Sequence, residues 1–156
     1  MVEFSHTAKT KFDEIVSRYP RKEAALLPTL WLAQEEFTTV TPEVMAYVAA
    51  LLDLPAAKVL GVTTFYTMYH TKPVGTYHIQ VCRTLSCAMA GSNALLDYLK
   101  KTFNVDLDEL TADGKFTISQ VECLANCDAA PAIQINATDY KQVSQEKMGE
   151  ILKKLP

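Results

Sequence analysis

The four cysteines of the chain fall into two pairs with different spacing. Cys82 and Cys87 are separated by four residues, Cys123 and Cys127 by three, and 35 residues lie between the pairs. A cysteine thiolate can act as a nucleophile, form a disulfide or bind a soft metal ion. The four thiols could therefore be buried core residues, disulfide partners, zinc ligands or the ligands of an iron-sulfur cluster.

The number of residues between the two cysteines of each pair helps to choose among these kinds of site. Neither pair has the two-residue gap of common zinc ribbons or of thioredoxin-type dithiols. Four thiolates can hold a [2Fe-2S] cluster, two on each iron. Small residues such as Ala88 and Ala125 leave room for backbone amides to approach the sulfur atoms. The pattern favours a cluster, while inert thiols, a structural zinc site and a thiol enzyme stay open.

Composition is that of an ordinary globular protein. Of the 156 residues, 49% are hydrophobic and 21% charged, and the formal net charge is -3. This balance gives no sign of a nucleic-acid surface. No apolar run approaches the roughly 20 residues that a membrane span needs, and the first residues resemble neither a secretory signal nor a transit peptide. We expect a soluble, cytoplasmic protein of a reducing compartment without direct membrane insertion, where thiols more often bind metal than form disulfides.

Residues 5–54 have the pattern of amphipathic helices. In PRKEAALLPTLWLAQEEF, the three-to-four-residue spacing predicts one buried face. Its expected members are Ala24, Leu27, Leu30, Trp31 and either Gln34 or Glu35.

The segment TPEVMAYVAALLDL is the clearest helix of this part. Thr41 is a suitable N-cap and Pro42 fits the first helical position. Its predicted buried stripe consists of Met45, Val48, Ala49 and Leu52.

An aromatic run follows a further short helix that begins near Pro55. We expect its members Phe65, Tyr66 and Tyr69 to pack in the core, because aromatic residues at helix ends are far more often buried than part of a ligand pocket.

The second half alternates strands and helices. TYHIQVC has a period of two and predicts a strand that ends at Cys82, and KFTISQVEC predicts a second strand that ends at Cys123. RTLSCAMAG between them is expected to be a loop, followed by an amphipathic helix in SNALLDYLKKTFNV. PAIQI predicts a third strand, and SQEKMGEILKKL a final helix capped by Ser144.

Each cysteine pair thus begins where a strand is expected to end. Four sulfur atoms should therefore meet at one end of the sheet. We expect an α+β or α/β chain with a helical bundle at residues 1–72 and a cluster domain at residues 73–156.

The chain resembles the 24 kDa subunit family of NADH:quinone oxidoreductase (complex I), with relatives in NAD-linked hydrogenases and formate dehydrogenases. The resemblance is carried by FDEIVSRYP, AALLPTLWLAQEEF, TPEVMAYVAALLDLP, VLGVTTFYTMY, VCRTLSCAMAGS and VECLANCDAAPAIQI. It implies a helical bundle followed by a thioredoxin-like [2Fe-2S] ferredoxin domain. It also implies that the cluster ligands are Cys82, Cys87, Cys123 and Cys127.

The function implied by the resemblance is electron transfer within a larger complex. The cluster would lie near the FMN of a partner NADH-binding subunit, in the peripheral arm of a membrane-attached enzyme with further subunits. The chain would be an oxidoreductase subunit that is not active alone and has no catalytic residue of its own. No GxGxxG loop is present, so NADH and FMN should bind elsewhere.

Two other functions stay open. One is the gamma-type diaphorase subunit of an NAD-linked hydrogenase or formate dehydrogenase. The other is a zinc-stabilised interaction module.

The sequence also makes predictions about individual residues, most of them near the cysteines. The family usually has glycine at the position of Ala125, so a positive φ there would strain this residue by about 1 kcal/mol. Arg83, Glu122 and Asp128 are expected to be solvated or interface charges. The three histidines are scattered along the chain, and we expect them at the surface or at an interface.

Overall fold

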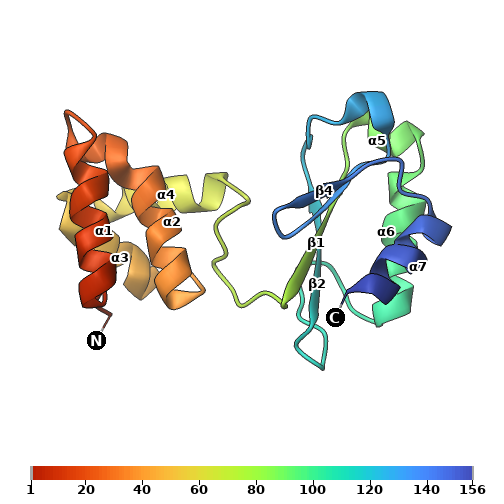
Figure 1. The fold of residues 1–156 in the computed structure, drawn as a ribbon, viewed down its shortest axis with the longest axis horizontal. Coiled ribbons are helices and arrows are strands. Elements are labelled where there is room, and N and C mark those ends of the chain that lie inside the picture. Colours follow the sequence, from red (N-terminus) through yellow and green to blue (C-terminus); the bar gives the residue numbers. More distant parts are fainter. Residues whose placement is uncertain (1, 156) are drawn as a thin grey trace. The chain divides into compact units, whose positions relative to one another are not determined.

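The computed structural model describes residues 2–155. It divides into two compact units, the first ending at Pro73 and the second beginning at Val74. The first is entirely helical (red to yellow in Figure 1), and the second combines helices with a sheet (green to blue). No described helix has the length and apolarity needed to cross a membrane.

Consecutive helices of the first unit pack on one another. They are α1 (His6–Ser17), the 3-10 helix η1 (Lys22–Ala25), α2 (Leu26–Phe37), α3 (Pro42–Leu52) and α4 (Ala56–Phe65). The predicted cap of α3 is confirmed, because the Thr41 hydroxyl accepts a hydrogen bond from the Val44 N–H at 3.4 Å and Pro42 begins the helix. Its predicted stripe, from Met45 to Leu52, is buried.

The predicted face of α2 is wrong in part. Leu30 and Gln34 are buried as expected, but Ala24 lies before the helix and Leu27 and Trp31 are exposed. The buried face instead comprises Leu26, Thr29, Leu30, Leu32, Ala33 and Gln34. Nearly every position from Leu26 to Ala33 is apolar, so the three-to-four-residue spacing does not select one face there.

The aromatic run is also less buried than expected. Tyr69 is in the core and donates its hydroxyl proton to the Leu27 carbonyl at 2.9 Å. Phe65, by contrast, is 77% exposed and Tyr66 39%. The reason is that α4 ends at Phe65 and Tyr66 is already extended, so these two rings leave the helical core.

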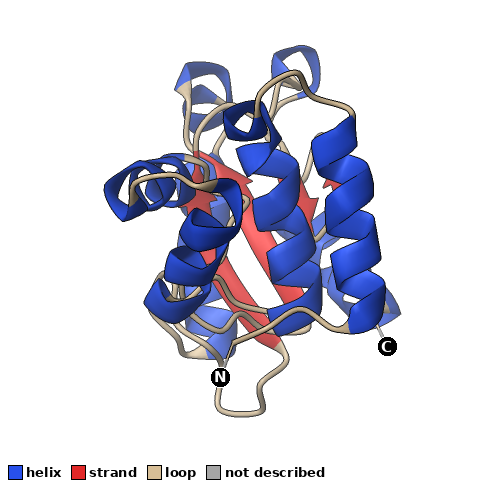
Figure 2. Ribbon diagram, turned by 90° about the vertical axis from the view of Figure 1, so that its left-hand side faces the viewer, coloured by secondary structure: helices blue, strands red, loops and turns tan. Residues whose placement is uncertain are grey.

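The second unit is built on a four-stranded mixed sheet in the order β2-β1-β3-β4. β1 (Tyr77–Cys82) and β2 (Phe116–Val121) are parallel, whereas β3 (Ile133–Ile135) and β4 (Thr138–Tyr140) add antiparallel neighbours. The strands are red in Figure 2. The remaining elements are α5 (Leu85–Met89), α6 (Ser92–Phe103), the 3-10 helix η2 (Cys127–Ala129) and α7 (Gln145–Lys154).

Helices α6 and α7 cover one face of this sheet (Figure 1). Leu95 and Leu99 of α6 and Met148 of α7 pack on Ile79 and Ile118 of the strands, and all five are almost fully buried. The predicted cap of α7 is confirmed, because the Ser144 hydroxyl accepts a hydrogen bond from the Lys147 N–H.

Three local predictions in this unit need correction. RTLSCAMAG is not only a loop, because it contains the helical turn α5. The second strand ends at Val121, two residues before Cys123. The strand β4 was not predicted, since its hairpin turn has Asn136 at φ 53 followed by Ala137 rather than by the usual glycine.

We expect Gly75→Ala to destabilise the second unit by about 1–3 kcal/mol, as overpacking does. A Cβ at Gly75 would lie 2.6 Å from backbone atoms of Phe116, at the start of the β1–β2 pairing. Urea unfolding followed by circular dichroism measures the change. Gly61→Ala in α4 is the control, because its Cβ meets nothing within 4 Å and alanine favours a helix by up to about 1 kcal/mol. Equal stability of Gly75→Ala and wild type would contradict this packing.

Candidate metal centre

Parallel pairing brings the two cysteine pairs to one edge of the sheet. Cys82 is the last residue of β1 and stands opposite Val121, the last residue of β2. Because parallel neighbours end at the same edge, Cys123 emerges two residues further on, beside Cys82. The expected placement of the pairs at strand ends is therefore what the structure has, apart from the two residues between β2 and Cys123.

The first pair is buried. Cys82 and Cys87 are each 1% exposed, and they pack with Ala132 and with the half-buried Leu124. Cys87 reaches this position because α5 turns the chain back after β1. The Cys82 N–H donates to the Ala132 carbonyl at 3.2 Å, which ties the first loop to the chain that leads into β3.

The second pair is exposed. The sulfur atoms of Cys123 and Cys127 lie 3.6 Å apart. The Ala125 N–H points at the sulfur of Cys123, 3.3 Å away, so the short loop between them turns an amide toward a ligand atom. The small residues beside the cysteines were expected to permit such contacts, and this one is confirmed.

Hydroxyl groups of the first loop reach the thiols of both pairs. Thr84 Oγ1 lies 3.2 Å from the sulfur of Cys82. The Thr84 hydroxyl also acts to lower the pKa of Cys123, and the Ser86 hydroxyl acts against the upward shift of the pKa of Cys127. Hydroxyl groups of the first loop thus influence thiols of both pairs, even though the pairs lie far apart in sequence.

These surroundings make the two thiols of each pair unequal. Burial acts to raise the pKa of Cys82, but hydrogen bonds from the Thr84 hydroxyl and the Leu124 N–H outweigh it and the pKa is lowered. The Ala125 N–H, as the main cause, lowers the pKa of Cys123. Burial raises the pKa of Cys87, and the hydrogen bond shared with Cys123 raises that of Cys127. One thiol in each pair is therefore set to ionise before the other. Metal binding requires all ligating thiols to lose their protons.

The donor set fits an iron-sulfur cluster. All four thiols are free, and backbone N–H groups approach three of them, which compensates thiolate charge. Within residues 2–155, no three His, Cys, Asp or Glu side chains are grouped to hold a single metal ion. A [2Fe-2S] cluster does not need such a group, because each of its irons takes only two protein ligands.

An ion pair joins the two loops beside the thiols. Arg83 Nε lies 3.0 Å from Glu122 Oε1, and both side chains are well exposed. Asp128 is exposed as well. The prediction of solvated charges at these positions agrees with their exposure, and an exposed pair of this kind adds little to stability.

One histidine is not where it was expected. His6 is exposed, but His78 is buried in β1, on the side of the sheet opposite to Ile79. Its Nε2 lies 2.7 Å from the Ser119 hydroxyl, which donates to Asp108 Oδ1 at 2.6 Å. Sequence reasoning missed this polar chain because it joins three distant segments. Its only signal was the alternation of TYHIQVC, which places His78 and Gln80 on the same face.

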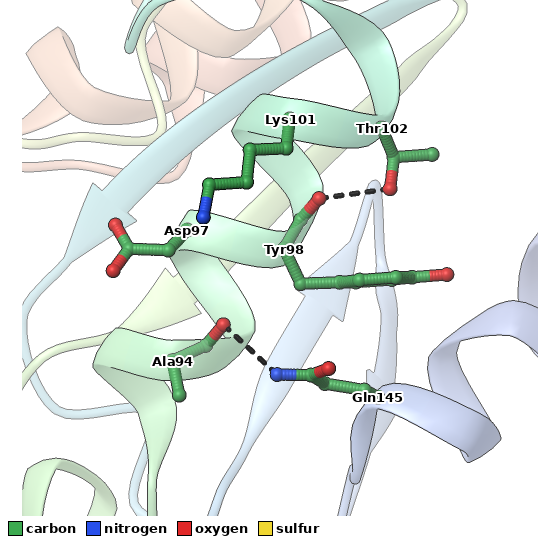
Figure 3. Close-up of a pocket in the computed structure, with 6 residues that line it drawn as sticks. All are labelled: Ala94, Asp97, Tyr98, Lys101, Thr102 and Gln145. Carbon is green, nitrogen blue, oxygen red and sulfur yellow. Dashed lines mark hydrogen bonds between the residues drawn. The ribbon is translucent and has the colours of Figure 1, made fainter.

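The pocket in Figure 3 is a surface groove without a cysteine. Ala94, Asp97, Tyr98, Lys101, Thr102 and Gln145 line it, from α6 and the start of α7. Gln145 Nε2 donates to the Ala94 carbonyl and Thr102 Oγ1 to the Tyr98 carbonyl, so these polar groups bond to the backbone of α6 itself. Nothing in this groove competes with the thiol site as a centre of chemistry.

The comparison with known proteins agrees with a cluster site built from four cysteine thiols. Residues 12–156 match the family described as thioredoxin-like [2Fe-2S] ferredoxin. The chain belongs to this family. The resemblance stated from the sequence is thereby confirmed, as are the mixed helix and sheet class and the [2Fe-2S] cluster as the family's cofactor.

Individual relatives indicate which proteins of this family the chain is similar to. One subunit of the NADH-quinone oxidoreductase of Rickettsia conorii is 44% identical over 146 residues, which cover 92% of this chain and 87% of the relative. NADH-quinone oxidoreductase subunit 2 of Thermus thermophilus is 41% identical, covering 82% of this chain and 72% of the relative. The crystal structure of an NAD+-reducing [NiFe]-hydrogenase in the H2-reduced state superposes on 84% of this chain and 22% of that chain, with a TM-score of 0.70. At 22% identity this likeness supports the fold only.

We expect Ala125→Gly to raise the reduction potential of this ferredoxin by up to about 40 mV, which corresponds to 1 kcal/mol for one electron. Ala125 has φ 58, a conformation that costs a residue with a Cβ about 1 kcal/mol. Strain that is equal in the two redox states does not change the potential, but glycine adopts this conformation freely and so lets the amide move closer to Cys123 when the centre gains negative charge. The strain energy is therefore the upper limit of the shift. Redox titration measures the shift, with Ala90→Gly as the control because Ala90 has a negative φ of -84. Identical potentials for Ala125→Gly and wild type would contradict the argument.

Glu122→Gln should also raise the potential. The substitution removes a negative charge next to Cys123 and leaves the Arg83 charge uncompensated, and both effects favour a reduced centre. Since the pair is exposed, the shift should shrink as the salt concentration rises. Glu109→Gln, near the far end of α6, serves as the matched control. A shift independent of salt, or equal in the control, would point to a cause other than local charge.

Proposed function

We propose that this chain is the electron-transfer subunit of an NADH:quinone oxidoreductase and binds one [2Fe-2S] cluster through Cys82, Cys87, Cys123 and Cys127. One observation carries the proposal. Two cysteine pairs meet at the ends of parallel strands in a chain whose relatives, at 44% and 41% identity, are named as subunits of that enzyme.

The four thiols would each supply one ligand, two from each loop. When bound, the cluster supplies reversible one-electron exchange. Cys82 and Cys87, packed against Leu124 and Ala132, exclude water from one side of the site. Amides directed at the sulfur atoms offset part of the negative charge that reduction adds. Cys123 and Cys127 leave the other side open to a redox partner.

NADH oxidation itself needs a partner subunit. The sequence has no glycine-rich loop for a dinucleotide phosphate, so FMN and NADH would bind on a flavin-bearing neighbour that passes single electrons to this chain. In this arrangement the chain would lie among further subunits in the cytoplasmic peripheral arm of a membrane-attached complex. The alternative is the gamma-type diaphorase subunit of an NAD-linked hydrogenase or formate dehydrogenase. The hydrogenase structure shares the fold of this chain at a TM-score of 0.70, which does not choose between the two functions. The identity to the oxidoreductase subunits, about twice as high, supports the first choice.

Replacing each proposed ligand tests the site. We expect Cys→Ser at positions 82, 87, 123 and 127 to lower or abolish cluster content after anaerobic purification, and to alter the electron paramagnetic resonance spectrum of any cluster that remains. Harder serine oxygen is a poorer ligand for iron in a cluster than thiolate. The control is Ser92→Ala, which removes a buried hydroxyl of the same unit but no thiol. A variant with wild-type iron content and spectrum would remove that cysteine from the ligand set.

The function is tested by supplying electrons from NADH. The chain is co-expressed with the flavin-bearing subunit of an NADH:quinone oxidoreductase, and the visible absorbance of the cluster is followed after NADH is added. We expect bleaching within seconds in the pair and none in the isolated chain, which lacks a flavin. Co-purification of the chain from its native cells identifies the host enzyme. Recovery with hydrogenase or formate dehydrogenase subunits, and not with a quinone-reducing complex, would replace our proposal by the alternative.

A further inference from the structure

Thr84 occupies the N-cap position of helix α5, but its hydroxyl does not cap the helix. A serine or threonine at this position usually accepts a hydrogen bond from an N–H group in the first turn. Ser5, Thr41 and Ser144 do so at the starts of α1, α3 and α7. The Thr84 side chain makes no such bond, although its carbonyl accepts the Ala88 N–H at 2.9 Å and so begins the helix in the ordinary way.

The Thr84 hydroxyl contacts the sulfur of Cys82 instead. The distance from Thr84 Oγ1 to Cys82 Sγ is 3.2 Å. Cys82 is almost fully buried and Thr84 is half-buried, so water has little access with which to replace this partner. The neighbouring Arg83 points its charge elsewhere, because it forms an ion pair with the exposed Glu122. The hydroxyl is therefore a polar side-chain partner that the fold directs at this thiol.

The chemical state of the sulfur decides which of the two groups donates the proton. Between a thiol and a hydroxyl, either group can be the donor. A cysteine that binds iron has lost its proton, so its sulfur can only accept. The direction of the Thr84–Cys82 hydrogen bond is thus fixed once the cysteine acts as a ligand.

We propose that the Thr84 hydroxyl donates a hydrogen bond to the ligand sulfur of Cys82 and thereby raises the reduction potential of the cluster. The inference rests on the function proposed above and adds a residue that sets the potential of the centre. One-electron reduction adds a negative charge, and hydrogen bonds to the sulfur atoms are among the factors that set the potential of such clusters. A donor at the sulfur stabilises the more negative, reduced state more than the oxidised state.

Two substitutions separate the hydroxyl group from the shape of the side chain. In Thr84→Val the branched side chain and the backbone N–H are kept, but there is no hydroxyl proton to donate. In the full-length, cluster-loaded chain we expect the ratio of reduced to oxidised cluster, at a fixed ambient potential, to fall about fivefold, the effect of one net hydrogen bond. This fold-change corresponds to a potential lower by about 40 mV, at 59 mV per tenfold for one electron. Thr84→Ser keeps the hydroxyl and should titrate as wild type does.

Ser144→Ala is the matched control, because it removes a hydroxyl of the same unit that caps a helix. It should lower the free energy of unfolding and leave the reduction potential as in wild type. A wild-type potential in Thr84→Val, or potentials lowered equally in Thr84→Val and Thr84→Ser, would overturn the role of the hydroxyl. Either result, obtained with a full cluster content, would leave the proposed function standing.

A crystal structure of the cluster-loaded wild-type chain tests the same point without a substitution. Thr84 Oγ1 should stay within hydrogen-bond distance of the Cys82 sulfur. A Thr84 hydroxyl that accepts the Cys87 N–H instead, as an ordinary cap does, would overturn the inference even if Thr84→Val does not fold or load. If the wild-type chain binds no two-iron cluster, the proposed function fails and this inference fails with it.

Discussion

The parallel pairing of β1 with β2 is the constraint on which the thiol site depends. Its register sets Cys82 opposite Val121, so both strands deliver their loops to one edge of the sheet. A parallel pair needs a crossover connection, and here that connection contains α5 and α6. The first turn of the crossover carries Cys87 back to Cys82, and the rest covers the sheet with Leu95 and Leu99. The same segment thus supplies a ligand position and part of the core.

The two cysteine pairs meet different requirements of an electron carrier. Cys82 and Cys87 form a buried side lined by backbone amides. This side holds the thiolates in place and limits their exchange with water. An open side lets a partner come close, and Cys123 and Cys127 provide that. The loop of the exposed pair adopts a left-handed conformation at Ala125, and this conformation aims its amide at Cys123. The backbone strain and the hydrogen bond to sulfur are two aspects of one loop geometry.

Sequence reasoning was reliable where one local signal decides the structure. Thr41 and Ser144 cap helices as their types and positions predict, and the alternation in TYHIQVC fixes a strand that ends at Cys82. Sequence reasoning failed where the apolar pattern was uniform along a helix, and where the interacting residues lie far apart in the sequence. The apolar run that begins at Leu26 does not reveal which face of α2 is buried, and the partners of His78 come from segments far along the chain. Likewise, the spacing of the cysteines pointed to one site but did not show which pair would be buried.

The central claim is that these four thiols hold one two-iron cluster. Anaerobic purification followed by iron, sulfide and zinc analysis, with electron paramagnetic resonance of the dithionite-reduced protein, measures this directly. The account predicts about two irons and two sulfides per chain and a rhombic signal of a single unpaired electron. Stoichiometric zinc without iron or sulfide, after the same anaerobic handling, would contradict it and make the thiols a structural metal site.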